Sequence, residues 1–222
     1  MFRDAALVAG KDLRIERRSR VTTQQIAPFA ILVLVLFAFA LDPDRGVLGR
    51  ASAGLYWLAV LFCAVLAVQR GALIESTDRA GEGLRLAGLD AGGVFIGKAA
   101  AVATQLLVLE ALLAVGVAFL YGTDLHEPVV LIGTALLATA GLAAAGTAYA
   151  AVASGLRVGN TLLPLLLLPV LAPVLLAATR AWEAGLAGEP GDAVSWLELL
   201  AAFAVLYVAV GVVGYGTLQE ES

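Results

Sequence analysis

Long apolar runs separated by short polar segments make up most of the chain. Each run is 19 to 26 residues long, and its apolar residues follow one another instead of alternating with polar ones. A helix needs about 20 residues to cross the hydrocarbon layer of a bilayer, and continuous runs favour helices over the alternating strands of a membrane barrel. The pattern therefore predicts an all-α membrane protein with six transmembrane helices, at about 21–41, 51–69, 99–121, 128–153, 161–179 and 196–215.

The composition agrees with residence in a bilayer. Hydrophobic residues make up 61% of the 222 residues and charged residues 14%, whereas soluble domains average about 45–50% and about 25%. We expect one transmembrane domain over residues 1–222. The net charge of −4 argues against nucleic acid as a partner, and the single cysteine, Cys63, excludes a disulfide within the chain.

Lysine and arginine are distributed unevenly over the segments between the runs. Eleven of the fourteen lie in the tail 1–20, in the segment 70–98 or at Arg157, and the other three are Arg45, Arg50 and Arg180. Cytoplasmic segments of membrane proteins carry the excess of positive charge, so the first group is predicted to be cytoplasmic. Six spans place both termini on that side. The tryptophans are then predicted to lie near the outer interface, as in an aromatic belt: Trp57, Trp182 and Trp196.

A cleaved signal peptide is the alternative to a first membrane span. Residues 38–40 read Ala-Phe-Ala, which fits the small-x-small pattern before a cleavage site. The polar region that precedes the run holds about 25 residues and six positive charges, which is long for the basic start of a signal peptide. We therefore favour a retained span. Cleavage would change both the number of spans and the side on which the N-terminus lies.

The tail 1–20 has the pattern of an amphipathic helix. Its apolar residues recur at helical spacing on one face, and its basic residues lie on the opposite face. The apolar face holds Phe2, Ala6, Ala9 and Leu13, and the basic face holds Arg3, Lys11, Arg14 and Arg18. We predict an elbow helix that lies on the inner membrane surface. The alternative is a disordered basic tail that only sets the topology.

The segment 75–98 is polar and rich in glycine, and its end resembles a phosphate-binding loop. Gly92, Gly97 and Lys98 have the spacing of that motif, but Ala99 stands where Ser or Thr would hold a magnesium ion. No strand-like stretch precedes the motif, and no nucleotide-binding domain fits the chain. We therefore expect no ATP site here and interpret Lys98 as an anchor at the membrane interface.

The same segment is predicted to be a cytoplasmic loop that contains a short helix. Glu75 and Arg79 stand four residues apart with the acid first, which supports a helix, and Glu75, Asp78 and Glu82 form a charged stripe. Glycines at 81, 83 and 88 limit its length. The helix would lie along the membrane and meet a cytoplasmic partner such as a separate ATPase. The alternative is a solvated loop whose charges pair with one another.

Three stretches of the sequence carry a family resemblance. The first is "KDLRIERRSR", which leads into "IAPFAILVLVLFAFALDP"; the second is "EGLRLAGLD" with Gly97-Lys98 after it; the third is "LLPLLLLPVLAPVLLAA". They resemble, in order, the basic elbow and first span, the acidic cytoplasmic loop and the paired prolines of span five in the CcmB family of haem exporter B proteins. The prolines are the most specific of the three, because the first two motifs also occur more loosely among ABC-2-type permeases. The resemblance extends over the whole chain.

The resemblance implies a permease subunit of the ABC-type complex of cytochrome c maturation, in the plasma (inner) membrane of a prokaryote. Such a subunit is not an enzyme and binds no cofactor of its own. The implied partners are a CcmA-type ATPase that binds ATP, a CcmC-type haem-handling subunit, a CcmE-type haem carrier and a second copy of the chain, with haem as the substrate. The loop 70–98 becomes the coupling loop to the ATPase, with candidate contacts at Glu75, Asp78, Glu82, Leu84, Arg85, Leu86 and Leu89.

Prolines and small residues distinguish the fifth and fourth runs. Pro164, Pro169 and Pro173 each remove a backbone donor and are predicted to bend the fifth helix. The bend is interpreted either as a hinge that moves with the ATPase cycle or as a static packing kink. The fourth run is predicted to pack closely against a neighbouring helix because it is rich in small residues: Gly133, Gly141, Ala145, Gly146 and Ala148.

Polar residues inside the runs are candidates for function. Gln105 and Glu110 lie in the third run, and Glu110 falls near the middle of the membrane. An acid there is costly unless it faces protein or a cavity, so Glu110 is a candidate for a substrate path or for subunit pairing, with a structural role as the alternative. The two side chains point about 140° apart on a helix and need not form one site.

His126, in the turn before Pro128, is interpreted as an exposed loop residue and not as a haem ligand.

The sequence contains no recognisable catalytic set or metal-binding cluster, so the function is carried by the resemblance. Three hypotheses stay open. In the first, the chain is a permease that moves haem. In the second, it is a scaffold that uses the conformational cycle of the ATPase to release haem-loaded carrier protein and transports nothing. In the third, it is an ABC-2-type exporter of another substrate. The sequence does not separate the first two.

Overall fold

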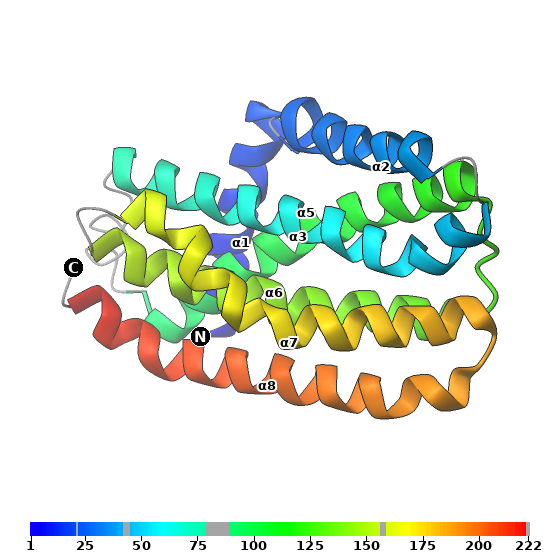
Figure 1. Cartoon of the computed structure of the whole chain (residues 1–222). Coiled ribbons are helices and arrows are strands. Elements are labelled where there is room, and N and C mark those ends of the chain that lie inside the picture. Colours follow the sequence, from blue (N-terminus) through cyan, green and yellow to red (C-terminus); the bar gives the residue numbers. More distant parts are fainter. Residues whose placement is uncertain (21, 42–44, 79–88, 156–158, 221–222) are drawn as a thin grey trace.

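The computed structural model describes residues 1–20, 22–41, 45–78, 89–155 and 159–220 (Figure 1). In that part of the chain there are seven α-helices and one π-helical turn. The helices are α1 Phe2–Ser19, α2 Ala27–Leu41, α3 Arg45–Asp78, α5 Ala91–Tyr121, α6 Pro128–Gly155, α7 Gly159–Ala187 and α8 Pro190–Glu220, and the π-helical turn Thr22–Ile26 joins α1 to α2. The prediction of an all-α protein is confirmed.

Six of these helices are long and apolar enough to cross a membrane, as the six apolar runs predict. The candidate spans are Gln24–Leu41, Gly46–Gly71, Ala91–Tyr121, Pro128–Val152, Leu167–Ala187 and Pro190–Thr217. Several helices extend beyond their apolar runs. α5 begins at Ala91 and not at residue 99, because the Asp90 side chain caps its first turn by accepting a hydrogen bond from the Gly93 amide at 2.7 Å.

The transmembrane helices run side by side as a bundle in which α6 contacts α3, α5, α7 and α8 (Figure 1). Small residues of α6 permit this close packing. A Cβ atom on Gly146 would meet the Val68 side chain of α3, and one on Gly141 would lie 3.6 Å from Val174 of α7. The close packing predicted for the fourth apolar run is confirmed.

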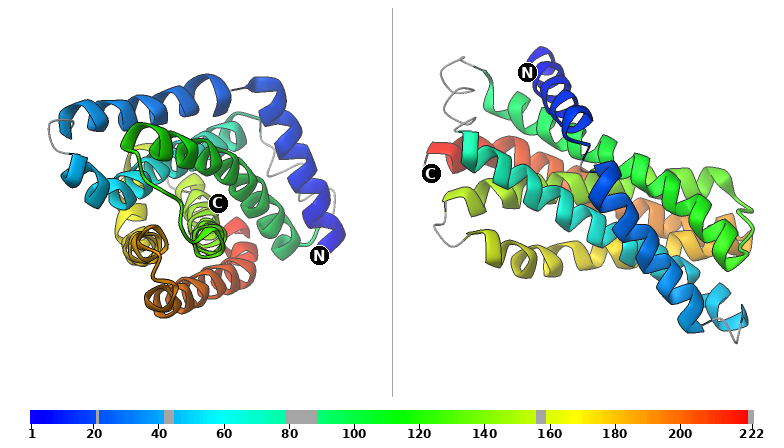
Figure 2. Two further views of the ribbon diagram at one scale, coloured as in Figure 1. Left: turned by 90° about the vertical axis from the view of Figure 1, so that its right-hand side faces the viewer. Right: turned by 90° about the horizontal axis from the view of Figure 1, so that it is seen from above.

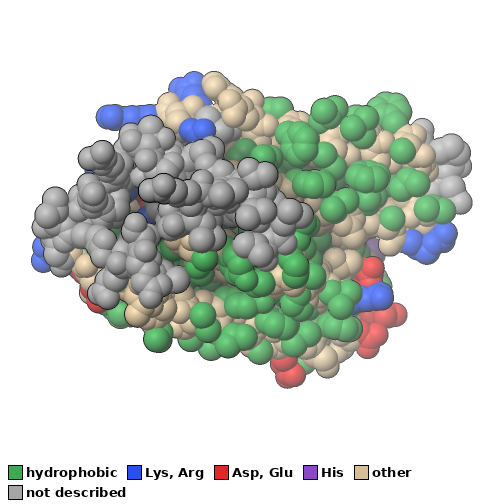
Figure 3. Space-filling model, turned by 60° about the vertical axis from the view of Figure 1, so that its left-hand side comes forward, with side chains coloured by type: hydrophobic (Ala, Val, Ile, Leu, Met, Phe, Trp, Pro, Cys, Tyr) green, Lys and Arg blue, Asp and Glu red, His purple; other side chains and the backbone are tan. Residues whose placement is uncertain are grey.

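The outside of the bundle is apolar, as expected for a surface that lipid tails cover. Phe119 is 90% exposed, Val213 81% and Phe39 76%. Figure 3 shows hydrophobic side chains over the middle of the molecule and most charged side chains toward its sides, with an acidic group on its lower edge. A soluble monomer rarely exposes a continuous apolar surface of this extent.

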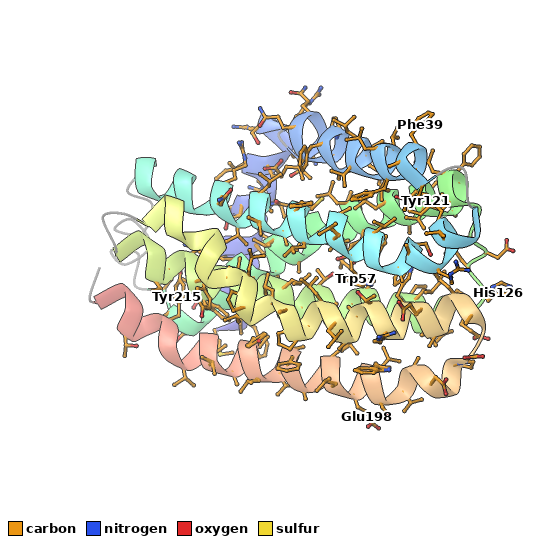
Figure 4. All side chains as sticks on the ribbon, viewed as in Figure 1. Phe39, Trp57, Tyr121, His126, Glu198 and Tyr215 are labelled. Atoms are coloured by element: carbon orange, nitrogen blue, oxygen red, sulfur yellow. The ribbon has the colours of Figure 1, made fainter. Side chains whose placement is uncertain are left out.

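Two of the three tryptophans lie inside the bundle and not in an interfacial belt, so that prediction is wrong for them. Trp57 and Trp182 are 1% and 3% exposed, and both pack on Tyr56. Figure 4 shows Trp57 inside the bundle. Trp196 is half-buried. The prediction used the position of each tryptophan along its span, whereas burial depends on the face of the helix that carries it.

α1 crosses the bundle near the end at which the N-terminus and the last turn of α8 lie (Figures 1 and 2). It lies against α5. The turns from α5 to α6 and from α7 to α8 lie at the opposite end. This arrangement agrees with an even number of spans.

Reporter fusions test the topology. A reporter fused after Ser222 is expected to be active in the cytoplasm, and one inserted within residues 184–192 is expected to be active outside, because six helices place these points at opposite ends of the bundle. The measurement is the paired activity of alkaline phosphatase and green fluorescent protein fusions at each point. The same location for both points would contradict the six spans.

Candidate functional site

Two glycines of α5 let α1 pack closely against the bundle. Gly93 and Gly97 stand one helical turn apart where α1 contacts α5. A Cβ atom on Gly93 would lie 2.8 Å from the Met1 carbonyl oxygen, and one on Gly97 would lie 2.6 Å from the Ala5 carbonyl oxygen. Small residues at this spacing let two helix backbones approach closely. Ala5 and Val8 are the buried side chains of α1 at this contact, at 7% and 1% exposure.

α1 is helical, as its pattern predicts. The face with which it contacts α5 is one that the pattern did not reveal. The buried residues Ala5 and Val8 lie about a quarter turn from the predicted apolar face that begins with Phe2. Phe2 itself is 82% exposed. The packing on α5 therefore leaves the predicted apolar face of α1 free to rest on lipid.

Lys98 lies inside this assembly and not on its surface. It is 6% exposed, and its ammonium nitrogen lies 5.8 Å from the centre of the Tyr215 ring of α8, within range of a cation–π interaction. This burial contradicts an anchor whose ammonium group reaches out to the membrane interface; the stretch from Gly92 to Lys98 forms the first two turns of α5. The sequence that resembles a phosphate-binding loop is thus helical and packs on α1 and α8.

Glu16 closes the elbow between α1 and α2. Its Oε1 accepts a hydrogen bond from the Thr22 amide at 2.7 Å, and its Oε2 lies 3.6 Å from Nε of Arg70 in α3. The left-handed backbone of Arg20, with φ of 53°, turns the chain out of α1. The sequence analysis did not single out Glu16. The available signal was an isolated acid among the arginines of 14–20.

α1 consequently contacts both helices that flank residues 79–88. At the start of α5, the Asp90 amide donates to Oδ2 of Asp4 at 3.4 Å. Near the end of α3, Arg70 pairs with Glu16. The two contacts lie at opposite ends of α1, so this helix bridges the two sides of the predicted coupling loop.

The predicted coupling residues lie mostly outside the described residues. Glu82, Leu84, Arg85 and Leu86 belong to 79–88, and the side chains of Glu75 and Asp78 are also outside the described part. The backbone at these two positions continues α3 to Asp78, so the inter-helix segment begins at residue 79 and not at Arg70. Leu89 is half-buried and packs in a cluster that includes Phe95 and Tyr215.

α7 continues as one helix through its three prolines. Pro169 is exposed and Pro173 is half-buried, while the side chain of Pro164 lies outside the described residues. The Tyr207 hydroxyl of α8 donates to the Val170 carbonyl at 2.8 Å. This bond ties α8 to the proline-bearing stretch of α7, although a proline frees the carbonyl four residues before it, at 165 for Pro169 and at 169 for Pro173, and not that of Val170. The hinge stays a prediction.

Glu110 is 2% exposed in the middle of α5. Its Oε1 accepts a hydrogen bond from the Thr139 hydroxyl of α6 at 2.5 Å, and its carbonyl oxygen accepts one from the Tyr56 hydroxyl of α3 at 3.2 Å. Gln105 is half-buried and does not line the pocket beside Glu110, so the two predicted residues do not form one site. Sequence reasoning missed Thr139 and Tyr56 because tertiary packing decides which residues of other helices face Glu110.

His126 is exposed in the turn between α5 and α6, at the end of the bundle away from the N-terminus (Figure 4). Its Nδ1 lies 2.9 Å from the Leu186 carbonyl oxygen, so the ring links this turn to the end of α7. The interpretation of His126 as an exposed loop residue is confirmed.

Glu198 is a candidate that the sequence analysis missed. It is exposed within the span Pro190–Thr217, and in Figure 4 its side chain points away from the bundle. Its exposed neighbours Val194 and Ala202 are apolar. A carboxylate on a lipid-facing surface is costly and usually pairs with another group, which makes this face of α8 a candidate contact for another subunit.

Residues 4–217 match the family model described as "CcmB protein". The chain belongs to the CcmB family. Three CcmB relatives carry the name "Heme exporter protein B". The protein from Paracoccus denitrificans is 32% identical over 204 residues, which cover 90% of this chain and 91% of the relative. Those from Haemophilus influenzae and Pseudomonas aeruginosa are 31% and 28% identical, over 78% and 90% of this chain and 79% and 90% of their own lengths. The resemblance inferred from the three motifs is confirmed.

Proposed function

We propose that this chain is the membrane subunit of an ABC-type complex in c-type cytochrome maturation, and that it couples ATP hydrolysis by a separate ATPase to haem export or to release of haem-loaded carrier protein. The observation that carries the proposal is the CcmB match over residues 4–217, together with relatives named "Heme exporter protein B" that align with most of the chain.

The geometry of the inner end supports coupling through residues 79–88. This segment connects α3 to α5, and α1 is attached to both helices through Arg70 and Asp90. A displacement of this segment by the ATPase would therefore move α1 together with α3 and α5. The long helices on either side suit the transmission of force, because α3 has 34 residues and α5 has 31.

The proposed complex has several members. A CcmA-type subunit would bind and hydrolyse ATP, and this chain would act without a nucleotide-binding site of its own. CcmC-type and CcmE-type proteins would handle and carry haem, and a second copy of the chain would complete the permease in the inner membrane of a bacterium. The exposed carboxylate of Glu198 in a transmembrane span supports contact with one of these membrane partners.

The experiment that tests the function uses the purified complex of this chain with its ATPase and the haem carrier in sealed vesicles. Haem accumulation that depends on ATP would identify an exporter. Carrier release that depends on ATP without accumulation would identify a mechanical role. An ATPase variant that binds ATP without hydrolysing it is the control, and the absence of both ATP-dependent effects would contradict the proposal.

The substitution His126→Ala tests whether haem handling uses a ligand from this chain. Maturation of c-type cytochromes is expected to stay near the wild-type level, because the exposed ring loses a single hydrogen bond, worth about 1 kcal/mol. The measurement is the yield of haem-stained cytochrome at equal levels of membrane-inserted protein. A large loss of yield at normal protein level would contradict this expectation and revive the hypothesis that His126 is a ligand.

A further inference from the structure

The face of α1 that points away from the bundle carries an excess of positive charge (Figure 2). Four exposed arginines lie within about 100° of one another around the helix: Arg3, Arg14, Arg17 and Arg18. The three acids of α1 do not neutralise them, because each acid has another partner. Asp4 pairs with the Met1 ammonium group at 3.3 Å, Asp12 with Lys11 at 2.7 Å, and Glu16 with Arg70 at 3.6 Å.

A groove of about 380 Å³ runs along part of this basic face. The described residues that line it all belong to α1, and they combine basic and apolar side chains, among them Arg14, Arg18, Leu7 and Ile15. Gly10 leaves room there, since no atom lies within 4 Å of the position that its Cβ would take. A groove with this lining suits an amphipathic ligand whose head is anionic.

The position of α1 indicates that this ligand is a lipid. Gly93 and Gly97, on which α1 packs, lie in the candidate span Ala91–Tyr121. We therefore expect α1 at the level at which α5 enters the membrane, where the phospholipid headgroups are found. Phe2 is 82% exposed and Leu7 57%, which is costly in water and favourable against acyl chains. An acidic protein surface would match the arginines but not these apolar side chains.

The spacing of Arg14 and Arg18 fits one phosphate group. Residues four apart are neighbours on a helix surface, so the two guanidinium groups can reach the same headgroup. A guanidinium group binds phosphate oxygens through two parallel N–H bonds. In the described part of the chain neither arginine takes part in an ion pair, so both are available to a phosphate.

We propose that this groove binds an anionic phospholipid, with the phosphate on Arg14 and Arg18 and the start of an acyl chain against Leu7 and Ile15. The lipid would complete the charge balance of α1 and hold the helix to one leaflet. The proposal goes beyond the proposed function, since lipid binding here needs neither ATP nor a partner subunit.

The test is native mass spectrometry of the full chain in detergent, which measures the binding of single lipids. The probes are dioleoyl phosphatidylglycerol and dioleoyl phosphatidylcholine, which share their acyl chains and differ in net charge. We expect phosphatidylglycerol to bind at about tenfold lower concentration. Glycerol phosphate, which has no acyl chains, is expected not to compete at the same concentration. Equal binding of the two lipids, or competition by glycerol phosphate, would overturn the proposal.

Variants separate a contact in the groove from general attraction to a basic helix. The pair Arg14→Gln and Arg18→Gln is expected to weaken phosphatidylglycerol binding about 30-fold. The matched control, Arg3→Gln with Arg17→Gln, removes the same charge from the same helix outside the groove. It is expected to change binding less than about threefold, because salt screens charges that do not touch the lipid. Equal losses in the two pairs would overturn the proposal.

Gly10→Glu is a second variant, which keeps every arginine and places an acid in the groove. It is expected to weaken phosphatidylglycerol binding about as much as the loss of Arg14 and Arg18, and it decides the matter if that pair does not fold. Unchanged lipid binding in Gly10→Glu would overturn the proposal. Normal lipid binding with a loss of co-purifying ATPase in the Arg14 and Arg18 pair would overturn it in favour of a protein partner.

Discussion

Replacing Gly97 with leucine is expected to detach α1 from α5 and to abolish the function of the complex. The first carbon of any side chain at this position would lie 2.6 Å from the Ala5 carbonyl oxygen and 2.7 Å from Cβ of Val8. Backbone atoms of a helix have little room to move, and overpacking of this kind costs about 3 kcal/mol or more. The equilibrium between seated and detached α1 would shift about 100-fold.

Trypsin reports this detachment because α1 is rich in lysine and arginine. In membranes, Gly97→Leu is expected to expose α1 to cleavage under conditions that leave the wild-type chain intact, and cytochrome maturation is expected to fall with it. Gly54→Leu is the matched control, since Gly54 lies in α3 with no atom within 4 Å of its Cβ position. Wild-type protease resistance in Gly97→Leu would show that α1 is not held by this contact.

The largest effect on coupling is expected from Leu86→Asp in the segment that joins α3 to α5. Interfaces depend on a few central apolar residues flanked by polar ones, and Leu84, Leu86 and Leu89 stand in this pattern beside Glu82. Loss of one such residue costs about 2 kcal/mol or more, or about 30-fold in affinity. The measurement is the amount of ATPase that co-purifies with the chain.

Glu82→Lys is expected to give the same loss by charge reversal, and haem-loaded carrier is expected to accumulate unreleased in both variants. Insertion into the membrane should be normal, because the spans are unchanged. Glu189→Lys, in the exposed turn before α8, is the matched control at the other end of the bundle. If the ATPase binds normally to both loop variants, the segment is a solvated linker and not the coupling site.

The number and type of the membrane helices were predictable because each one is an uninterrupted apolar run. Helix ends were less predictable, since hydropathy falls where a helix leaves the bilayer although the helix continues. Asp90 illustrates this: an aspartate before Ala91 is a typical N-cap, a signal that the prediction from hydropathy did not use and that marks the start of α5.

The contacts between helices were the least predictable part. Gly93 and Gly97 have the spacing of a close helix contact, but Gly92 and Lys98 beside them drew attention to a different motif, and the sequence does not say which helix the glycines meet. Glu110 was recognised as unusual from its type and depth. Its partners Thr139 and Tyr56 come from α6 and α3, and only the packing of the bundle brings them to it.

The contact of α1 with α5 is also expected to set the height of the protein in its bilayer. α5 and α8 have 31 residues each, or about 46 Å of helix, whereas the hydrocarbon layer is about 30 Å thick. Helix length alone would let the bundle slide along the membrane normal. If α1 rests at the inner interface, as its apolar face predicts, we expect the bundle to meet a thinner or thicker bilayer by tilting or by moving its outer turns. Hydrophobic mismatch would then be absorbed at the outer face, and the face that carries α1 would stay at a constant distance from the lipid headgroups.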